Sequence, residues 1–176
     1  VDKSYRSGLE VETELKLLKN LKLLTSTTIS KNKILVFNEY IDDYDLGIQI
    51  NNQYQNSDIA FSPNVIAGAG LDYQLKKNTN FNLTAKYVGE QYLDNTQNNN
   101  KKINDYAYLN FRTTHTFHGV KFKSITLGVQ INNLLNTLYE ANGYTYSYLY
   151  GQTLITENFY YPQAGVNFML MCNFKF

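Results

Sequence analysis

The side chains that could do chemistry in this chain are few. It contains two histidines, His115 and His118, and one cysteine, Cys172. An activated nucleophile needs a base within hydrogen-bond reach, but His115 falls on the apolar side of an alternating stretch and His118 falls in a short predicted turn. A single cysteine cannot form an intrachain disulfide, and these three residues lack the spacing of a metal site. The sequence therefore predicts no catalytic residue, no metal site and no cofactor.

Carboxylates recur at every second residue near the beginning of the chain, as Glu10, Glu12 and Glu14. Side chains that share one face in this way could pair for acid–base work. The same face of the predicted sheet also carries basic residues, namely Lys16, Lys22, Lys86 and Arg112. We therefore favour a hydrated, charge-balanced wall over a catalytic pair.

A second acidic group, Asp42, Asp43 and Asp45, offers the oxygen ligands that calcium prefers. Its spacing does not match a known calcium-binding loop, so we expect a solvated loop instead. The net charge of +1 arises from 16 basic and 15 acidic residues spread along the chain. Because this distribution gives no electrostatic footprint for a nucleic-acid backbone, nucleic acid is excluded as a partner.

Several stretches of the chain alternate apolar and polar residues with a period of two, the pattern of a strand with two different faces. These stretches are residues 9–17, 21–29, 65–75, 81–87, 107–114, 125–131 and 166–176. The last shows the pattern best, since one of its faces reads Val166, Phe168, Leu170, Cys172, Phe174, Phe176. The first two stretches predict a tight hairpin, and a helix competes there because Leu, Glu and Lys are strong helix formers.

Short and long connectors take turns between these stretches. The short ones lie at residues 19–20, at 76–80 and around His118–Gly119, and the long ones at about 33–58, after Leu93, and at about 136–162. The polar run 98–102 has the composition of an exposed loop tip. A soluble sandwich has no reason to keep its short turns at one end and its long loops at the other. The sequence thus predicts an all-β fold: an antiparallel transmembrane β-barrel segment of about seven strands, with short periplasmic turns and long extracellular loops.

Membrane insertion by strands is compatible with the rest of the composition. No apolar run approaches the ~18 residues of a spanning helix, which excludes helical membrane proteins, whereas a barrel strand needs only about nine to eleven residues. The alternative is a soluble or surface-exposed β-sandwich that acts as a ligand-binding module. The two architectures differ in what covers the apolar face, because a sandwich buries it beneath a second sheet.

Tyrosines are concentrated in the longest connector, and the sequence holds 16 of them in all. Tyrosine offers a large amphipathic surface at low entropic cost, and a long connector would lie at the extracellular mouth. We therefore expect ligand contact from Tyr144, Tyr146, Tyr148 and Tyr150. The alternative is an upper aromatic girdle with strand extensions, because these four residues also alternate.

Three segments carry a resemblance to a known family. They read YVGEQYLDNT at residues 87–96, INNLLNTLYEANGYTYSY at residues 131–148 and YYPQAGVNFMLMCNFKF at residues 160–176. In this order and spacing they resemble the C-terminal portion of TonB-dependent outer-membrane receptors, particularly those of Bacteroidota. The resemblance extends over residues 1–176, which we treat as the C-terminal part of such a barrel, with the plug domain and earlier strands absent.

The resemblance implies a receptor of the Gram-negative outer membrane that imports a scarce nutrient, such as a ferric siderophore, haem, cobalamin or an oligosaccharide. It implies no enzymatic activity. The expected partners are the remainder of the barrel and the plug, the inner-membrane TonB complex acting through the missing N-terminal part, the barrel-assembly machinery, outer-membrane lipid and, in some receptors, a surface lipoprotein. Phe174 and Phe176 match the terminal aromatic signal read by the assembly machinery. A secretion signal would lie upstream or have been removed.

Overall fold

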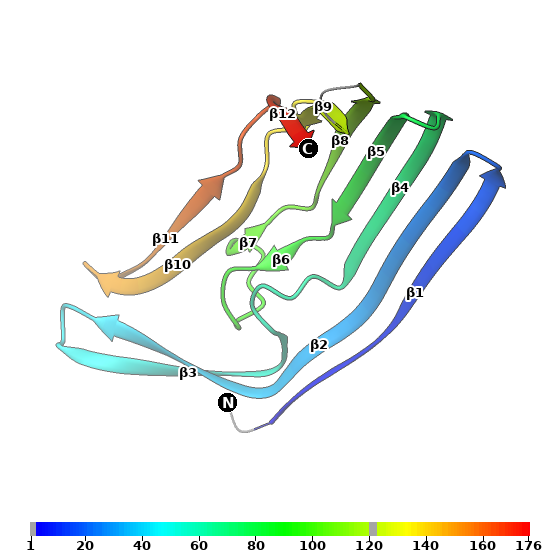
Figure 1. Ribbon diagram of the computed structural model, residues 1–176. Helices are drawn as coiled ribbons and strands as arrows, with labels where there is room; N and C mark the ends of the chain where they lie inside the picture. The colour runs from blue at the N-terminus through cyan, green and yellow to red at the C-terminus, as the bar shows by residue number, and fades with distance from the viewer. Residues whose placement is uncertain (1–2, 120–122) are drawn as a thin grey trace.

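The computed structural model describes residues 3–119 and 123–176, and every regular element within these ranges is a β-strand (Figure 1). Within the same ranges, no helix has the length and apolar character needed to cross a bilayer. Ten of the strands form one curled sheet and two form a small separate sheet. The predicted all-β class is therefore confirmed.

Seven long strands make up the wall of this sheet, and each alternating stretch of the sequence falls on one of them. They are β1 (Ser4–Leu18), β2 (Leu21–Asp43), β4 (Val65–Lys76), β5 (Thr79–Val88), β8 (Tyr106–Phe117), β9 (Ser124–Asn132) and β12 (Asn167–Lys175). Every neighbouring pair in this order is antiparallel. The hairpin predicted for residues 9–29 is confirmed, and the helix is wrong. The third short turn includes residues 120–122, which lie outside the described part of the chain.

Register places apolar side chains beside apolar ones across the whole wall. One unbroken row of paired residues runs through all seven strands: Leu15, Leu23, Leu71, Leu83, Phe111, Ile131, Phe168. The adjacent row is polar almost throughout: Lys16, Lys22, Asp72, Asn82, Arg112, Gln130, Met169. Because neighbouring residues of a strand point to opposite faces, the wall has one apolar face and one polar face.

The polar face is the concave one. Arg112 of β8 and Met171 of β12 meet there, with the guanidinium Nη2 3.7 Å from the sulfur, although β9 lies between their strands. Gly128 of β9 lies beneath this contact, where a Cβ atom would stand 2.7 Å from Met171 Cε. Side chains of second-neighbour strands converge in this way when the sheet curls toward them.

The apolar face is uncovered, which makes the sandwich alternative wrong. The exposed fractions of Leu127, Phe168 and Phe174 are 46%, 75% and 54%. A sandwich would bury such residues beneath a second sheet, whereas a barrel wall turns them toward lipid. The apolar side chains that are buried gather elsewhere, in and beside the long connectors: Ile34, Ile41, Val88, Leu93, Ile103.

The long connectors contain strands beyond the seven alternating stretches of the sequence. β2 continues to Asp43 and pairs with β3 (Ile48–Asp58), and β10 (Glu140–Tyr150) pairs with β11 (Thr153–Pro162). The segment between β5 and β8 contains the small sheet of β6 (Gln91–Tyr92) and β7 (Lys102–Ile103). Distal β2 and β3 pair through polar residues such as Asn38 and Gln53, and among these strands only β10 shows an alternation in the sequence, that of its tyrosines.

Candidate functional site at the long-loop end

Three connectors meet at the end of the wall opposite the short turns. They are the β2–β3 hairpin, the 89–105 segment and the β10–β11 hairpin, which together we name the loop junction (Figure 1). The tips of the two hairpins touch, because β10 pairs in parallel with β2 and the Tyr44 amide donates to the Leu149 carbonyl at 3.0 Å. The Asp45 carboxylate accepts hydrogen bonds from the amides of Gly151 and Gln152 at 3.1 and 2.9 Å.

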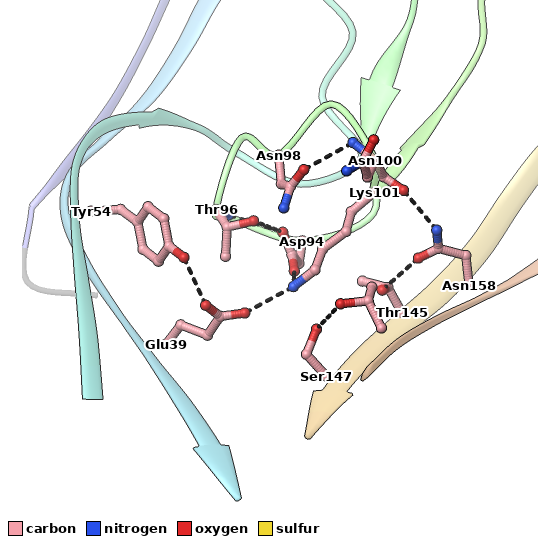
Figure 2. Close-up of polar contacts among 11 residues, drawn as sticks. Glu39, Tyr54, Asp94, Thr96, Asn98, Asn100, Lys101, Thr145, Ser147 and Asn158 are labelled. Atoms are coloured by element: carbon pink, nitrogen blue, oxygen red, sulfur yellow. Dashed lines mark hydrogen bonds and ion pairs between the residues drawn. The ribbon is translucent and has the colours of Figure 1, made fainter. Parts of the chain in front are cut away.

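A buried lysine ties the 89–105 segment to the β2–β3 hairpin (Figure 2). Lys101 is only 4% exposed, and its ammonium lies 2.9 Å from Glu39 Oε1 and 3.0 Å from Asp94 Oδ2. Tyr54 donates a hydrogen bond to the other Glu39 oxygen at 2.8 Å. The sequence predicted an exposed tip for residues 98–102. That prediction is wrong for Lys101, because two carboxylates compensate for the removal of its charge from water.

The same contacts perturb two pKa values in the loop junction. Burial opposes the charge of Lys101, but its hydrogen bonds to Glu39 and Asp94 outweigh this effect, so the pKa of Lys101 is raised. Burial together with the hydrogen bond to Glu39 raises the pKa of Tyr54 to about 12. Both groups therefore keep their protons, and the cluster its internal hydrogen bonds, throughout the physiological pH range.

The 89–105 segment also binds the β10–β11 hairpin (Figure 2). Asn158 donates to the Asn100 carbonyl at 2.7 Å and accepts from the Thr145 hydroxyl at 2.7 Å. Tyr160 donates to the Lys102 carbonyl at 3.2 Å. The segment therefore holds both hairpins, and the three connectors form one hydrogen-bonded unit.

The predicted ligand-contacting tyrosines lie on the other face of the β10–β11 hairpin. Tyr144 stacks on Phe159 at 4.8 Å between ring centroids, and Tyr146 lies 5.8 Å from Tyr148. Tyr146 donates to Glu157 at 2.5 Å, and this bond, with burial, raises the pKa of Tyr146 to about 12. Tyr150 follows on the same face by alternation. The structure thus brings the four together in one aromatic ladder, in which Tyr144, Tyr146 and Tyr150 are exposed and Tyr148 is half-buried against Tyr44.

Some of the charged groups considered from the sequence have structural partners. Glu14 pairs with Lys22 at 2.8 Å on the concave face, as expected for a charge-balanced wall. The acidic group at the β2–β3 tip is not simply solvated, because Asp43 is buried and accepts hydrogen bonds from the amides of Asp45 and Leu46. Within the described residues, no group of three or more His, Cys, Asp or Glu side chains is arranged to hold a metal ion.

The two histidines lie where the alternation placed them. His115 shares the apolar face with Phe117, whose ring centroid is 4.3 Å away, and its Nδ1 is 2.7 Å from the Thr79 hydroxyl. His118 lies at the third short turn, with Nδ1 3.3 Å from the Lys123 carbonyl oxygen. A hydrogen-bonded histidine on a face turned to lipid has no access to a soluble substrate.

A hollow of about 680 Å³ occupies the concave face below the loop junction. It extends from β1 to β8, and its lining includes Glu12, Lys86 and Asn110. Small residues such as Gly68 and Gly70 have no side chain to fill the centre of the hollow. A concave surface that carries both acidic and basic residues and few bulky side chains can pack against another folded element, or allow a polar ligand to pass along it.

Comparison with known proteins identifies the wall. The family described as "TonB dependent receptor-like, beta-barrel" matches residues 1–134. The chain belongs to this family of TonB-dependent receptors. No curated protein matches the chain.

Solved structures of TonB-dependent receptors share this fold. The siderophore receptor PiuA from Acinetobacter baumannii superposes with a TM-score of 0.73 at 17% identity, over 98% of this chain and 22% of that one. The ferric yersiniabactin uptake receptor FyuA from Yersinia pestis gives 0.54 at 15%, over 96% and 23%. The ferric enterobactin receptor PfeA from Pseudomonas aeruginosa gives 0.50 at 18%, over 79% and 18%. The chain thus spans about a quarter or less of these receptors.

Sequence reasoning missed the residues that assemble the loop junction of this receptor segment. Glu39 and Lys101 are 62 positions apart, and Asp45 and Gly151 are 106 apart. No local pattern connects residues at such separations. The one available signal was the alternation of Tyr144, Tyr146, Tyr148 and Tyr150, which correctly indicated a strand extension.

Proposed function

We propose that the chain forms part of the barrel of a TonB-dependent receptor that imports a scarce nutrient across the outer membrane of a Gram-negative bacterium. The observation that supports this most is the unbroken apolar row across seven strands, backed by a polar concave face. A wall of this kind separates lipid from a hydrated lumen. The nutrient would be a ferric siderophore, haem, cobalamin or an oligosaccharide, moved without covalent change and therefore without a catalytic residue.

The rest of the receptor is part of the proposal. Seven strands cannot close a barrel of the family's size, because strand number, tilt and shear are linked. Residues 1–176 would form its C-terminal part, completed by the remaining strands, a plug in the lumen and the inner-membrane TonB complex that pulls on it. The short turns would face the periplasm and the loop junction the exterior.

Two groups of residues have roles in this proposal. The aromatic ladder of Tyr144, Tyr146, Tyr148 and Tyr150 would contact the arriving ligand, or a surface lipoprotein that delivers it, through its ring edges and hydroxyls. Phe174 and Phe176 are exposed at the end of the last strand. They would be read by the barrel-assembly machinery before outer-membrane lipid covers the apolar face.

Energised uptake tests this proposal. Cells that carry or lack the complete receptor would be given iron-55 siderophores, haem, cyanocobalamin and labelled oligosaccharides, with and without a proton-motive force. We expect accumulation of at least one of these only in energised cells that carry the receptor. Accumulation that does not depend on the receptor or on the proton-motive force would overturn the proposed function.

A further inference from the structure

A second, smaller pocket opens on the concave face where the wall meets the loop junction. It has a volume of about 200 Å³, and it shares Tyr108 and Asn110 with the larger hollow. Its other polar lining comes from Asn132, Tyr139, Gln163 and Asn167. Because Asn132 and Asn167 are register partners on the same face as Gln130, the pocket faces the lumen.

A fully bonded asparagine holds this pocket in shape. Asn133 has a φ of 51° and is 3% exposed. Its carboxamide accepts from the Thr137 amide at 2.9 Å and donates to the carbonyls of Thr137 and Ala164 at 2.9 and 3.1 Å. Since these bonds join the two ends of the β9–β12 connector, the segments that carry Tyr139 and Gln163 are fixed relative to each other. Asn133 is thus a positioning residue for the pocket.

Stacked aromatic rings form one wall of the pocket. Tyr139 lies over the rings of Tyr106 and Tyr108, with centroid distances of 4.4 and 5.5 Å and interplanar angles of 20° and 12°. The hydroxyls of Tyr108 and Tyr139 make no hydrogen bond to the protein within the described residues, and the same is true of Asn110 Nδ2. The pocket lining is therefore mainly polar, with uncommitted donors and acceptors beside the rings of Tyr108 and Tyr139.

The uncharged, hydrogen-bonding side chains of this lining favour a neutral ligand that has hydroxyl groups. None of its described residues is charged, so it lacks the arginine or lysine that binds carboxylates, phosphates and anionic chelates. Carboxamides and phenols donate and accept, which matches hydroxyl groups that do the same. A volume of about 200 Å³ is below the ~300–1,000 Å³ of a whole-ligand site, and suits one ring of a larger molecule.

We propose that this pocket is a subsite for one sugar ring of a neutral oligosaccharide. The inference rests on the proposed function and narrows its substrate class. The ring would lie against Tyr108 and Tyr139, with its hydroxyls bonded to Asn110, Gln163 and the two phenols. An anionic ferric chelate would leave these groups unmatched and its own charge uncompensated.

Titration calorimetry on the complete receptor, purified in detergent, tests the subsite. The probes are maltoheptaose, cellohexaose and a fructo-oligosaccharide, with ferric tris-catecholate as the anionic comparison. We expect one neutral oligosaccharide to bind and the catecholate not to bind. Tyr108→Ala should weaken that binding about tenfold or more through loss of ring contact, and Tyr108→Phe about 2- to 10-fold through loss of the hydroxyl.

Tyr5→Ala is the matched control, because Tyr5 is an exposed tyrosine on β1, outside the loop junction, and does not line this pocket. Its affinity should equal that of the wild type, and heat-shifted electrophoretic mobility confirms that each variant has assembled. Oligosaccharide affinity unchanged by Tyr108→Ala would overturn the subsite, as would catecholate binding without oligosaccharide binding. Energised uptake of the catecholate would then leave the proposed function standing, whereas absence of all receptor-dependent uptake would overturn both.

Discussion

Replacing Lys101 with methionine should loosen the loop junction by local opening. The variant keeps the length of the side chain but leaves Glu39 and Asp94, both within 3.0 Å of the ammonium, without their shared counter-charge. Removing one partner of a buried ion pair costs about 3–5 kcal/mol. Asp94 retains partial contact with solvent, so we take the lower end, ~3 kcal/mol, which corresponds to a ~150-fold increase in the open population at 1.36 kcal/mol per tenfold.

Native-state hydrogen exchange of the complete receptor measures this opening directly. The Leu93 amide donates to the Lys101 carbonyl at 2.8 Å, so peptides that cover β6 and β7 report on the cluster. Lys102→Met is the matched control, because the adjacent lysine forms a 2.6 Å pair with Glu90 that is open to solvent. Such pairs contribute ~0–1 kcal/mol. Equal exchange in the two variants would refute the reasoning that burial makes Lys101 important.

A triple variant distinguishes two possible causes of faster exchange in Lys101→Met: uncompensated carboxylate charge and lost side-chain packing. Adding Glu39→Gln and Asp94→Asn to Lys101→Met removes the uncompensated carboxylates while leaving the shapes similar. If charge is the cause, the triple variant should exchange more slowly than Lys101→Met alone. Exchange as fast as in the single variant would assign the effect to lost packing.

Three other outcomes follow from the structure. Leu83→Arg on the apolar face should lower the yield of assembled, heat-modifiable barrel, at a cost of ~2–4 kcal/mol in lipid, while Thr84→Arg on the concave face should not. The Tyr54 pKa, raised from 10.0 to about 12, means that its bond to Glu39 stabilises the junction below pH 10 and is lost between pH 10 and 12. Because the pKa of Tyr146 is also raised to about 12, ultraviolet titration of Tyr54→Phe should show one fewer late-titrating phenol than the wild type, not the loss of all of them. Gly143→Ala would place a Cβ 2.5 Å from the Phe159 carbonyl, so it should lower the thermal stability of the hairpin by ~1–3 kcal/mol. Gly119→Ala, whose added Cβ would have no atom of the described residues within 4 Å, should be neutral.

The wall could be predicted from the sequence because, in each of its strands, the alternation of apolar and polar residues distinguishes the two faces. Leu83 and Phe111 alternate with polar neighbours, and pairing them needs only the connectivity that the short turns impose. The strands of the loop junction could not be predicted, since β3 and the distal part of β2 bond through residues such as Gln53 and Asn38, which are polar and give no period.

The loop junction and the smaller pocket beside Tyr108 and Tyr139 could not be predicted from the sequence either, because both depend on contacts between distant residues. Lys101 was placed in an exposed tip because it follows three asparagines, and only the fold reveals the two carboxylates that surround it. Asn133 likewise looked like any loop asparagine, although its carboxamide closes a connector of about 30 residues. Burial of polar groups depends on distant partners, which local composition does not encode.

Spin-label accessibility at two neighbouring residues tests the central claim that the apolar face meets lipid and the concave face meets water. Single cysteines would replace Ile131 and Gln130 in the complete receptor, in a Cys172→Ser background, reconstituted in bilayers. Oxygen, which concentrates in lipid, should broaden the signal at Ile131, and a water-soluble nickel chelate should broaden it at Gln130. Equal access of the nickel chelate to both sites, or the reverse pattern, would contradict the account.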